Sequence, residues 1–231
     1  MPEDTFFTKR YLESRLLARQ RAEREFVDQN PDLIQLLAVS NEYLAGCMLN
    51  LSGKDFGQVP HGLYACDLIV SFTRTYFIAI DLIRQGELIE AAVLVRKQIE
   101  LLARLHELSA NNDLDAMIRK TPNVKSLTTK LRKLYSSYSE VAHSADPIHL
   151  QQLGRIEDER HIWTSVYPQY SENAAITFQH ILLSLAEFHG WASPNLSEVF
   201  SEEEYSAFQE SFVVFVNEYV RTYELPASRH A

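Results

Sequence analysis

Hydrophobic residues recur every three or four positions over most of the chain, which is the spacing that places them on one face of an α-helix. The most apolar stretches are residues 63–85 and 87–108, separated only by Gly86. Glycine tolerates the left-handed conformation that often ends a helix, so we expect Gly86 to cap the first of these two helices. Because the connection is so short, the sequence predicts an antiparallel helix hairpin at the centre of the fold.

Breaks in the same periodicity delimit the other helices. They are predicted at residues 31–51, 113–119, 124–143, 171–188 and 201–223. Pro31 suits the first turn of a helix, and Ser201 with Glu204 has the spacing of a capping box. Pro147 disfavours helical geometry in the residue before it, and Gly190 is interpreted as a helix stop.

Two regions need separate treatment. Residues 148–170 lack clean periodicity, and we expect an irregular loop that packs Trp163 and Tyr167 onto the bundle. The last helix is expected to bury Phe208, Phe212, Val213, Phe215, Val216 and Val220. The whole pattern predicts an all-α fold, an up-down bundle of about six to eight helices.

The first 29 residues differ from the rest in their charge density. Lys9 and five arginines alternate with acids, and an incomplete apolar stripe that includes Phe6 and Leu16 runs between them. This pattern predicts an amphipathic helix, either an arm that joins a homodimer interface or a solvated surface helix. Residues 30–231 are predicted to form a single helical-bundle domain.

Composition narrows the functional classes. The chain has 231 residues, of which 46% are hydrophobic, and a formal net charge of −9. Because proteins that wrap nucleic acid over a wide surface are usually basic, extensive non-specific binding is not expected, although a local basic site stays open. Cys47 and Cys66 fall within helical patterns, which favours reduced thiols over a disulfide framework. No apolar signal segment begins the chain, and three charges interrupt residues 63–83, so we expect a cytoplasmic protein without a membrane span.

The helix predicted at residues 124–143 carries a row of polar side chains suited to binding or acid–base chemistry. Tyr135, Ser139 and His143 are spaced by four residues and therefore share one strip of helix surface. Ser144 follows directly. The opposite face of the same helix is apolar, so a plain solvated polar face is the alternative interpretation.

A second polar pair lies in the helix predicted at residues 87–108. Arg96 and Glu100 are four residues apart, which permits an ion pair that ties this helix to its neighbours. Alternatively, the guanidinium of Arg96 binds an anion or a partner helix, since its geometry is bidentate. The ordinary solvated face of the helix is assigned to Glu90, Lys97 and Arg104. We expect the two polar rows to form one binding site that contains Arg96, Glu100, Tyr135, Ser139, His143 and Ser144.

A run of basic residues precedes the polar row. Six cations and no acid occur in this run, namely Arg119, Lys120, Lys125, Lys130, Arg132 and Lys133. In an acidic chain such a patch can recruit an anionic group such as a phosphate of RNA, while a solvated charge run is the alternative.

Metal and nucleophile chemistry receive little support. Glu140 and His143 match the Glu-x-x-His pattern of di-iron bundles, but those sites need the motif on two helices. A metal site would have to draw on distant histidines such as His61, His180 or His189. Neither a nucleophile elbow nor a glycine-rich phosphate loop is present in the sequence, and no cofactor is predicted.

The motif residues over positions 63–147 resemble a known family. Arg96-x3-Glu100 followed by Tyr135-x3-Ser139-x3-His143-Ser144 is similar to the signature of a group of bacterial all-helical proteins that carry a domain of unknown function. That group is distantly similar to HEPN domains, helical bundles of prokaryotic defence and toxin systems. Some of these are metal-independent ribonucleases with an Arg-x4-6-His motif, a spacing that Arg132 and His143 do not have.

The resemblance and the residues together predict a non-catalytic binding or interaction module of a defence or stress system. The first alternative is a HEPN-like ribonuclease, in which His143 is the base and Arg96 or Arg132 stabilises the phosphorane. Arg155 and His161 have the motif's spacing but lie in the irregular region. The second alternative is a metal-binding helical bundle.

Overall fold

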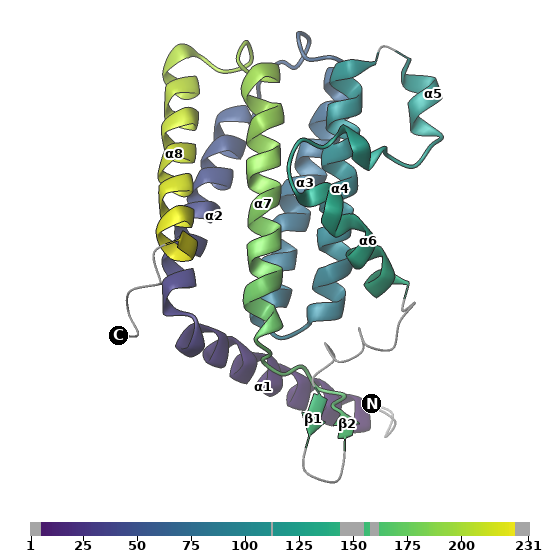
Figure 1. Cartoon of the computed structure of the whole chain (residues 1–231), viewed down its shortest axis with the longest axis vertical. Coiled ribbons are helices and arrows are strands. Elements are labelled where there is room, and N and C mark those ends of the chain that lie inside the picture. The colour runs from purple at the N-terminus through teal and green to yellow at the C-terminus, as the bar shows by residue number, and fades with distance from the viewer. Residues whose placement is uncertain (1–5, 112, 144–154, 158–161, 225–231) are drawn as a thin grey trace.

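The computed structural model describes residues 6–111, 113–143, 155–157 and 162–224. The fold is an all-α bundle, as the hydrophobic pattern predicts. Its long helices lie side by side, and α3 and α8 run in the opposite direction to α2, α4 and α7 (Figure 1). They are α2 (Pro31–Leu51), α3 (Gly62–Arg84), α4 (Leu88–Ala110), α7 (Asn173–Asn195) and α8 (Glu202–Glu224).

The hairpin of α3 and α4 lies at the centre, where α7 packs against both helices. Phe72 of α3 stacks on Phe188 of α7 with ring centroids 5.0 Å apart, and both rings are fully buried. Gly86 ends α3 with a φ of 76°, which confirms the predicted left-handed cap. A side chain at this position would also meet the carbonyl oxygen of Gln169, so the turn depends on glycine for two reasons.

Helix α1 (Phe6–Gln29) lies across one end of the bundle (Figure 1). Phe26 is fully buried and packs edge-on against Phe178, which fixes the C-terminal part of the helix. Further along, Arg15 and Arg19 both donate to the carboxylate of Glu87 at the start of α4, at 2.7 and 2.9 Å. The large apolar side chains of its N-terminal part are exposed, namely Phe6, Phe7, Leu12, Leu16 and Leu17.

The helix predicted at residues 124–143 is in fact divided, so that prediction was wrong over its first part. A single 3-10 turn, η2 (Val124–Ser126), follows the short α5 (Leu114–Ile118), and α6 begins only at Leu131 and ends at Ala142. The backbone amides of Thr128 and Thr129 donate to the carboxylate of Glu187 on α7. Because these amides are taken by a side chain, a continuous helix cannot form through them.

The predicted stop at Gly190 is also wrong, because α7 continues to Asn195. The residues of α7 beyond Gly190 include the buried Trp191, whose indole nitrogen donates to Ser109 at 2.8 Å. Glycine within a helix costs only about 1 kcal/mol, which is less than burial of an indole contributes. Tertiary packing therefore extends the helix past Gly190, which by itself only weakly favours a stop.

Helix α8 begins as predicted but buries fewer residues. The Ser201 amide donates to Glu204 at 2.8 Å and the Glu204 amide to the Ser201 hydroxyl at 3.3 Å, which confirms the capping box. Phe208 and Phe215 are buried, whereas Val213 is 56% exposed. Val216 and Val220, also predicted as core, are exposed as well, because the buried face follows the aromatic residues that pack around Tyr43.

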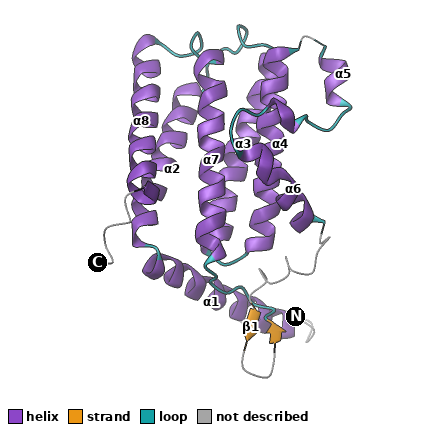
Figure 2. Ribbon diagram, in the orientation of Figure 1, coloured by secondary structure: helices purple, strands orange, loops and turns teal. Residues whose placement is uncertain are grey.

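Part of the region predicted as an irregular loop forms a two-stranded antiparallel hairpin (Figure 2). Strand β1 (Arg155–Glu157) pairs with β2 (Ile162–Thr164), and the Trp163 backbone lies opposite Ile156. Ile, Trp and Thr are residues that favour strands, and here the segment Ile162–Thr164 finds a partner close by in the chain. Tyr167 packs on α1 by stacking against Tyr11, while the side chain of Trp163 lies outside the described part of the chain. No helix among the described residues is long and apolar enough to cross a membrane.

Candidate functional site

The candidate site lies where α6 crosses α4 (Figure 1). Leu131 and Val141 of α6 are buried against the bundle, and so is the ring of Tyr138, because apolar residues recur on one side of this helix. The neighbouring face of α6 is thereby held over α4. The polar residues at this boundary meet each other rather than pointing only into solvent.

Four side chains form a connected group that we call the polar cluster, namely Arg96, Glu100, Tyr135 and His143. The Nε atom of Arg96 donates to Glu100 Oε1 at 3.1 Å, and the Tyr135 hydroxyl donates to the same oxygen at 2.9 Å. The Nη1 atom of Arg96 lies 3.1 Å from His143 Nε2. The guanidinium carbon also lies 5.6 Å from the centre of the Tyr135 ring, within range of a cation–π interaction.

Charges within the polar cluster nearly cancel. The guanidinium of Arg96 faces the carboxylate of Glu100, and a Nε2 atom of His143 that accepts from Arg96 must be unprotonated. Burial alone would lower the pKa of Arg96, but the contacts with Tyr135 and Glu100 outweigh it and raise that pKa. The side chains of Arg96 and Glu100 are 22% and 27% exposed, so the cluster is open to a ligand.

Of the two serines in the predicted site, only Ser139 lies within the described residues. Ser139 lies one turn before His143, and its hydroxyl oxygen is buried without a hydrogen-bond partner in the described structure. Such a group is costly to leave unpaired. Ser144 lies outside the described residues.

Arg132 does not belong to the polar cluster. It lies in the first turn of α6, and eleven residues of helical rise put it about 16 Å from His143 along the helix. Arg132 therefore cannot act on the same group as His143. It lines a separate groove together with Lys130 and Lys133.

The basic run is consequently split by the fold. Lys130, Arg132 and Lys133 face a groove of about 800 Å³ that α7 and α8 complete. Arg119, Lys120 and Lys125 are exposed but are not among the residues that line this groove. Only the second half of the run predicted from sequence therefore faces the groove.

Arg104 corrects the interpretation of the outer face of α4. The sequence pattern places it in the solvated stripe, but it is only 4% exposed. Its guanidinium donates to the carbonyl of Lys120 and pairs with Glu107 at 2.8 Å. Glu90 and Lys97, the other members of the stripe, are exposed as expected.

Glu187 holds together the segment before α6 and the helices α4 and α7, and it is not among the residues predicted from the sequence. Its carboxylate is fully buried, accepts from the amides of Thr128 and Thr129, and lies 2.8 Å from Nε2 of His106. Burial alone would raise the pKa of Glu187, but these donors outweigh burial and lower the pKa to about 2. A single acid inside the apolar run ILLSLAEFHGW was the signal that could have identified it.

The histidines considered for a metal site lie apart and have other partners. His61 lies 3.0 Å from the carbonyl of Asn111, His180 lies 2.8 Å from the Tyr138 hydroxyl, and His189 lies 3.1 Å from the hydroxyl of Tyr43. Within the described residues no three histidine, cysteine or acidic side chains converge on a point where a metal ion could be held. Glu140 accepts from Ser136 at 3.4 Å.

Comparison of the chain with protein-family models, with curated proteins and with solved structures gives no significant match in any of the three.

Proposed function

We propose that the protein is a non-catalytic helical binding module whose binding surface surrounds the polar cluster. The observation that supports this proposal is the contact between Arg96 and His143, which joins two helices at a partly exposed edge of the bundle. One helical turn before His143, the buried hydroxyl of Ser139 has no partner in the described structure. The side chains of the polar cluster together offer donors and acceptors over a short stretch of surface.

The charge balance of the polar cluster indicates what kind of group it binds. Glu100 lies 3.1 Å from Arg96 and would repel a phosphate or carboxylate brought to the same guanidinium. A neutral polar group that both donates and accepts, such as a peptide amide, suits the cluster better. The partner we propose is therefore another protein that presents backbone or side-chain amides.

The family resemblance of the motif residues supports a setting for this module. A cytoplasmic protein of a prokaryotic defence or stress system is consistent with Cys47 and Cys66, both of which are free thiols. The exposed apolar residues of α1, among them Phe7, Leu12 and Leu17, supply the surface for the homodimer that we propose. Light scattering of the Leu12→Glu and Leu17→Glu variants tests this dimer, since a dimer that uses α1 dissociates to monomers in both.

A metal-independent, HEPN-like ribonuclease is the second candidate. It is favoured by the 3.1 Å approach of a guanidinium to an imidazole, the two groups that such chemistry needs. His143 would accept the proton of an RNA 2′-hydroxyl through Nε2 as that oxygen attacks phosphorus, and Arg96 would stabilise the negative charge on the phosphorane oxygens. Glu100 speaks against this candidate because it already pairs with Arg96.

The two candidates are separated by incubating the purified chain with RNA in the presence of EDTA. The binding module predicts no cleavage that depends on His143, as judged by the His143→Ala and Arg96→Ala variants. A rate that falls about 10²-fold or more in His143→Ala would replace the binding module by the ribonuclease.

A positive test of binding uses a photo-crosslinking amino acid at position 143 in the cells that express the chain. Position 49 serves as the matched control, because Leu49 is 76% exposed and belongs to α2, which lies on the opposite side of α7 from α6 (Figure 1). Protein adducts formed at position 143 but not at position 49 support the proposal. The same adducts at both positions, or none at position 143, contradict it.

A further inference from the structure

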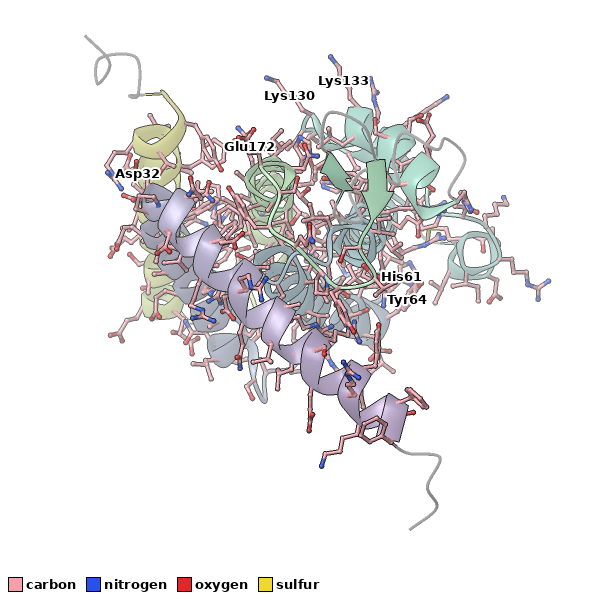
Figure 3. The ribbon with its side chains drawn as sticks, turned by 90° about the horizontal axis from the view of Figure 1, so that it is seen from below. Asp32, His61, Tyr64, Lys130, Lys133 and Glu172 are labelled. Atoms are coloured by element: carbon pink, nitrogen blue, oxygen red, sulfur yellow. The ribbon has the colours of Figure 1, made fainter. Side chains whose placement is uncertain are left out.

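The groove beside the first turn of α6 has a composition unlike that of the polar cluster. One wall consists of Lys130, Arg132 and Lys133, and the other consists of residues of α7 and of the last turns of α8. Figure 3 shows Lys130 and Lys133 close together, with their amino groups directed away from the ribbon. We call this surface the basic groove.

The cations of the basic groove have no acidic partner among the described residues. No ion pair or hydrogen bond involves the side chains of Lys130, Arg132 or Lys133 within that part of the chain. The carboxylate that binds the segment before these cations is that of Glu187, which is buried and already holds Thr128, Thr129 and His106. The positive charge of the groove is therefore uncompensated, in a chain whose formal net charge is −9.

The position of these cations at the N-terminal end of α6 adds to the positive charge of the groove. The first turn of α6 contains no acid, although the free amides of a helix N-terminus carry partial positive charge and favour one there. Placing Arg132 and Lys133 at this end therefore weakens the helix by itself. An anion bound in the basic groove removes this disadvantage, because the cations and the helix N-terminus then both attract the anion.

The opposite wall is aromatic and polar. The rings of Tyr219 and Tyr223 lie 4.8 Å apart, and Gln179 donates to the Tyr219 hydroxyl at 3.3 Å. The hydroxyl of Tyr223 is buried and has no hydrogen-bond partner in the described structure. Leu127 and Leu183 add apolar surface. This wall suits an organic group next to the anion.

From this composition we infer that the basic groove binds a small ligand that carries a diphosphate or triphosphate group. Three unpaired cations within one turn of helix match the charge of such a group, and guanidinium binds phosphate oxygens in pairs. A groove of about 800 Å³ has the size of a small-molecule site. The phosphate chain lies along Lys130, Arg132 and Lys133, and any attached nucleoside lies against Tyr219 and Gln179.

The test is a calorimetric titration of the full chain at one fixed, low salt concentration with four probes. Inorganic triphosphate and ATP carry the same phosphate chain with and without a nucleoside, adenosine lacks the phosphates, and a short single-stranded RNA supplies phosphodiesters. The variant Arg132→Glu/Lys133→Glu reverses two charges of the groove. Lys120→Glu/Lys125→Glu is the matched control, since it makes the same change in net charge outside the groove.

Binding of ATP and triphosphate that weakens at least about tenfold in Arg132→Glu/Lys133→Glu, and much less in the control, supports the inference. Tighter binding of ATP than of triphosphate assigns Tyr219 and Gln179 to a nucleoside, and equal affinities assign the groove to an inorganic polyphosphate. Binding of RNA alone, binding weakened equally by both double variants, or no binding of either phosphate probe overturns it. Neither double variant alters Arg96, Glu100 or His143, so failure here leaves the function proposed for the polar cluster to its own tests.

Discussion

Arg96 on α4 and His143 at the end of α6 lie 47 residues apart in sequence, yet Nη1 of the arginine approaches Nε2 of the histidine to 3.1 Å. The contact depends on how α6 is anchored at its two ends. Glu187 binds the segment before the helix, and Val141 is buried near its last turn. A helix of twelve residues is too short to be stable alone, so these tertiary contacts determine where its polar face lies.

Tyr135 links the two helices through Glu100, and its hydroxyl can be removed without changing the ring. Replacing Tyr135 by Phe is expected to lower the free energy of unfolding by about 1 kcal/mol, because the Glu100 carboxylate loses a donor at 2.9 Å. Urea denaturation followed by circular dichroism measures this change.

Tyr64→Phe is the matched control for that measurement. The hydroxyl of Tyr64 has no hydrogen-bond partner in the described structure, so its removal should change stability by less than about 0.5 kcal/mol. An equal effect of the two substitutions would show that the Tyr135–Glu100 bond contributes nothing specific.

Features that depend on a few neighbouring residues could be predicted from the sequence. Gly86 supplies the left-handed conformation that its own turn needs, and Ser201 and Glu204 satisfy each other's amides within one helical turn. Arg96 and Glu100 meet because four residues make about one turn. Each of these signals is contained in a short segment, so no knowledge of the tertiary fold was needed.

Features that depend on distant partners could not be predicted in this way. The start of α6 is set by Glu187, 58 residues beyond Thr129, and the continuation of α7 past Gly190 is set by burial of Trp191. The separation of Arg132 from the polar cluster follows from where the helix starts. Local propensities of about 1 kcal/mol decide such boundaries only when tertiary contacts do not.

Gly86 and Gly190 provide a matched pair of substitutions by alanine. Gly86→Ala is expected to destabilise the fold by about 2 kcal/mol or more, because φ is 76° and the new Cβ would lie 2.4 Å from the carbonyl oxygen of Gln169. Gly190→Ala should stabilise it by about 0.5–1 kcal/mol, since this glycine is inside α7 with open space around its Cα. Thermal unfolding of both variants checks the opposite signs, and a loss of stability in Gly190→Ala would contradict the assignment of that residue to a regular helix.

Glu187 should make stability depend on pH in the acid range. Its pKa is lowered to about 2 in the folded chain, against an ordinary value of 4.5, so the folded state binds this proton less readily than the unfolded state. The stabilisation is therefore fully present above about pH 4.5 and is lost as the pH falls toward 2, by up to about 3 kcal/mol.

Glu187→Gln is expected to be less stable than the parent chain at pH 7 by about 3 kcal/mol, with a smaller loss on acidification. Denaturant titrations between pH 7 and 3 measure both effects. Glu203→Gln, on the exposed first turn of α8, is the control that should change neither. The same acid dependence in the parent chain and in Glu187→Gln would show that another group is responsible.

His189 should act in a higher pH window. Burial lowers its pKa to about 4, from an ordinary value of 6.5. Its ring stacks on that of Phe212, with the ring centroids 3.6 Å apart. The folded state thus keeps His189 neutral where the unfolded state is already protonated, and stability falls as the pH decreases from about 6.5 to 4. His189→Gln, which can still form a hydrogen bond with Tyr43, should lose about 1–3 kcal/mol less than the parent chain over this window. If the two proteins lost the same free energy of unfolding between pH 7 and pH 4.5, His189 would be excluded as the titrating group.

If the basic groove binds an anion, Arg132 should strengthen ligand binding but lower the stability of the ligand-free chain. Without ligand, Arg132→Glu should be more stable than the parent chain by about 0.3–1 kcal/mol, because an acid replaces a cation in the first turn of α6. With inorganic triphosphate the order should reverse, since a ligand that binds only the folded parent chain raises its unfolding temperature. Thermal unfolding with and without triphosphate measures both, and Arg132→Gln should lie between the two proteins in each condition. A structural role for Arg132 would instead make Arg132→Glu the less stable protein without ligand, because the substitution would then remove a contact that the parent chain needs.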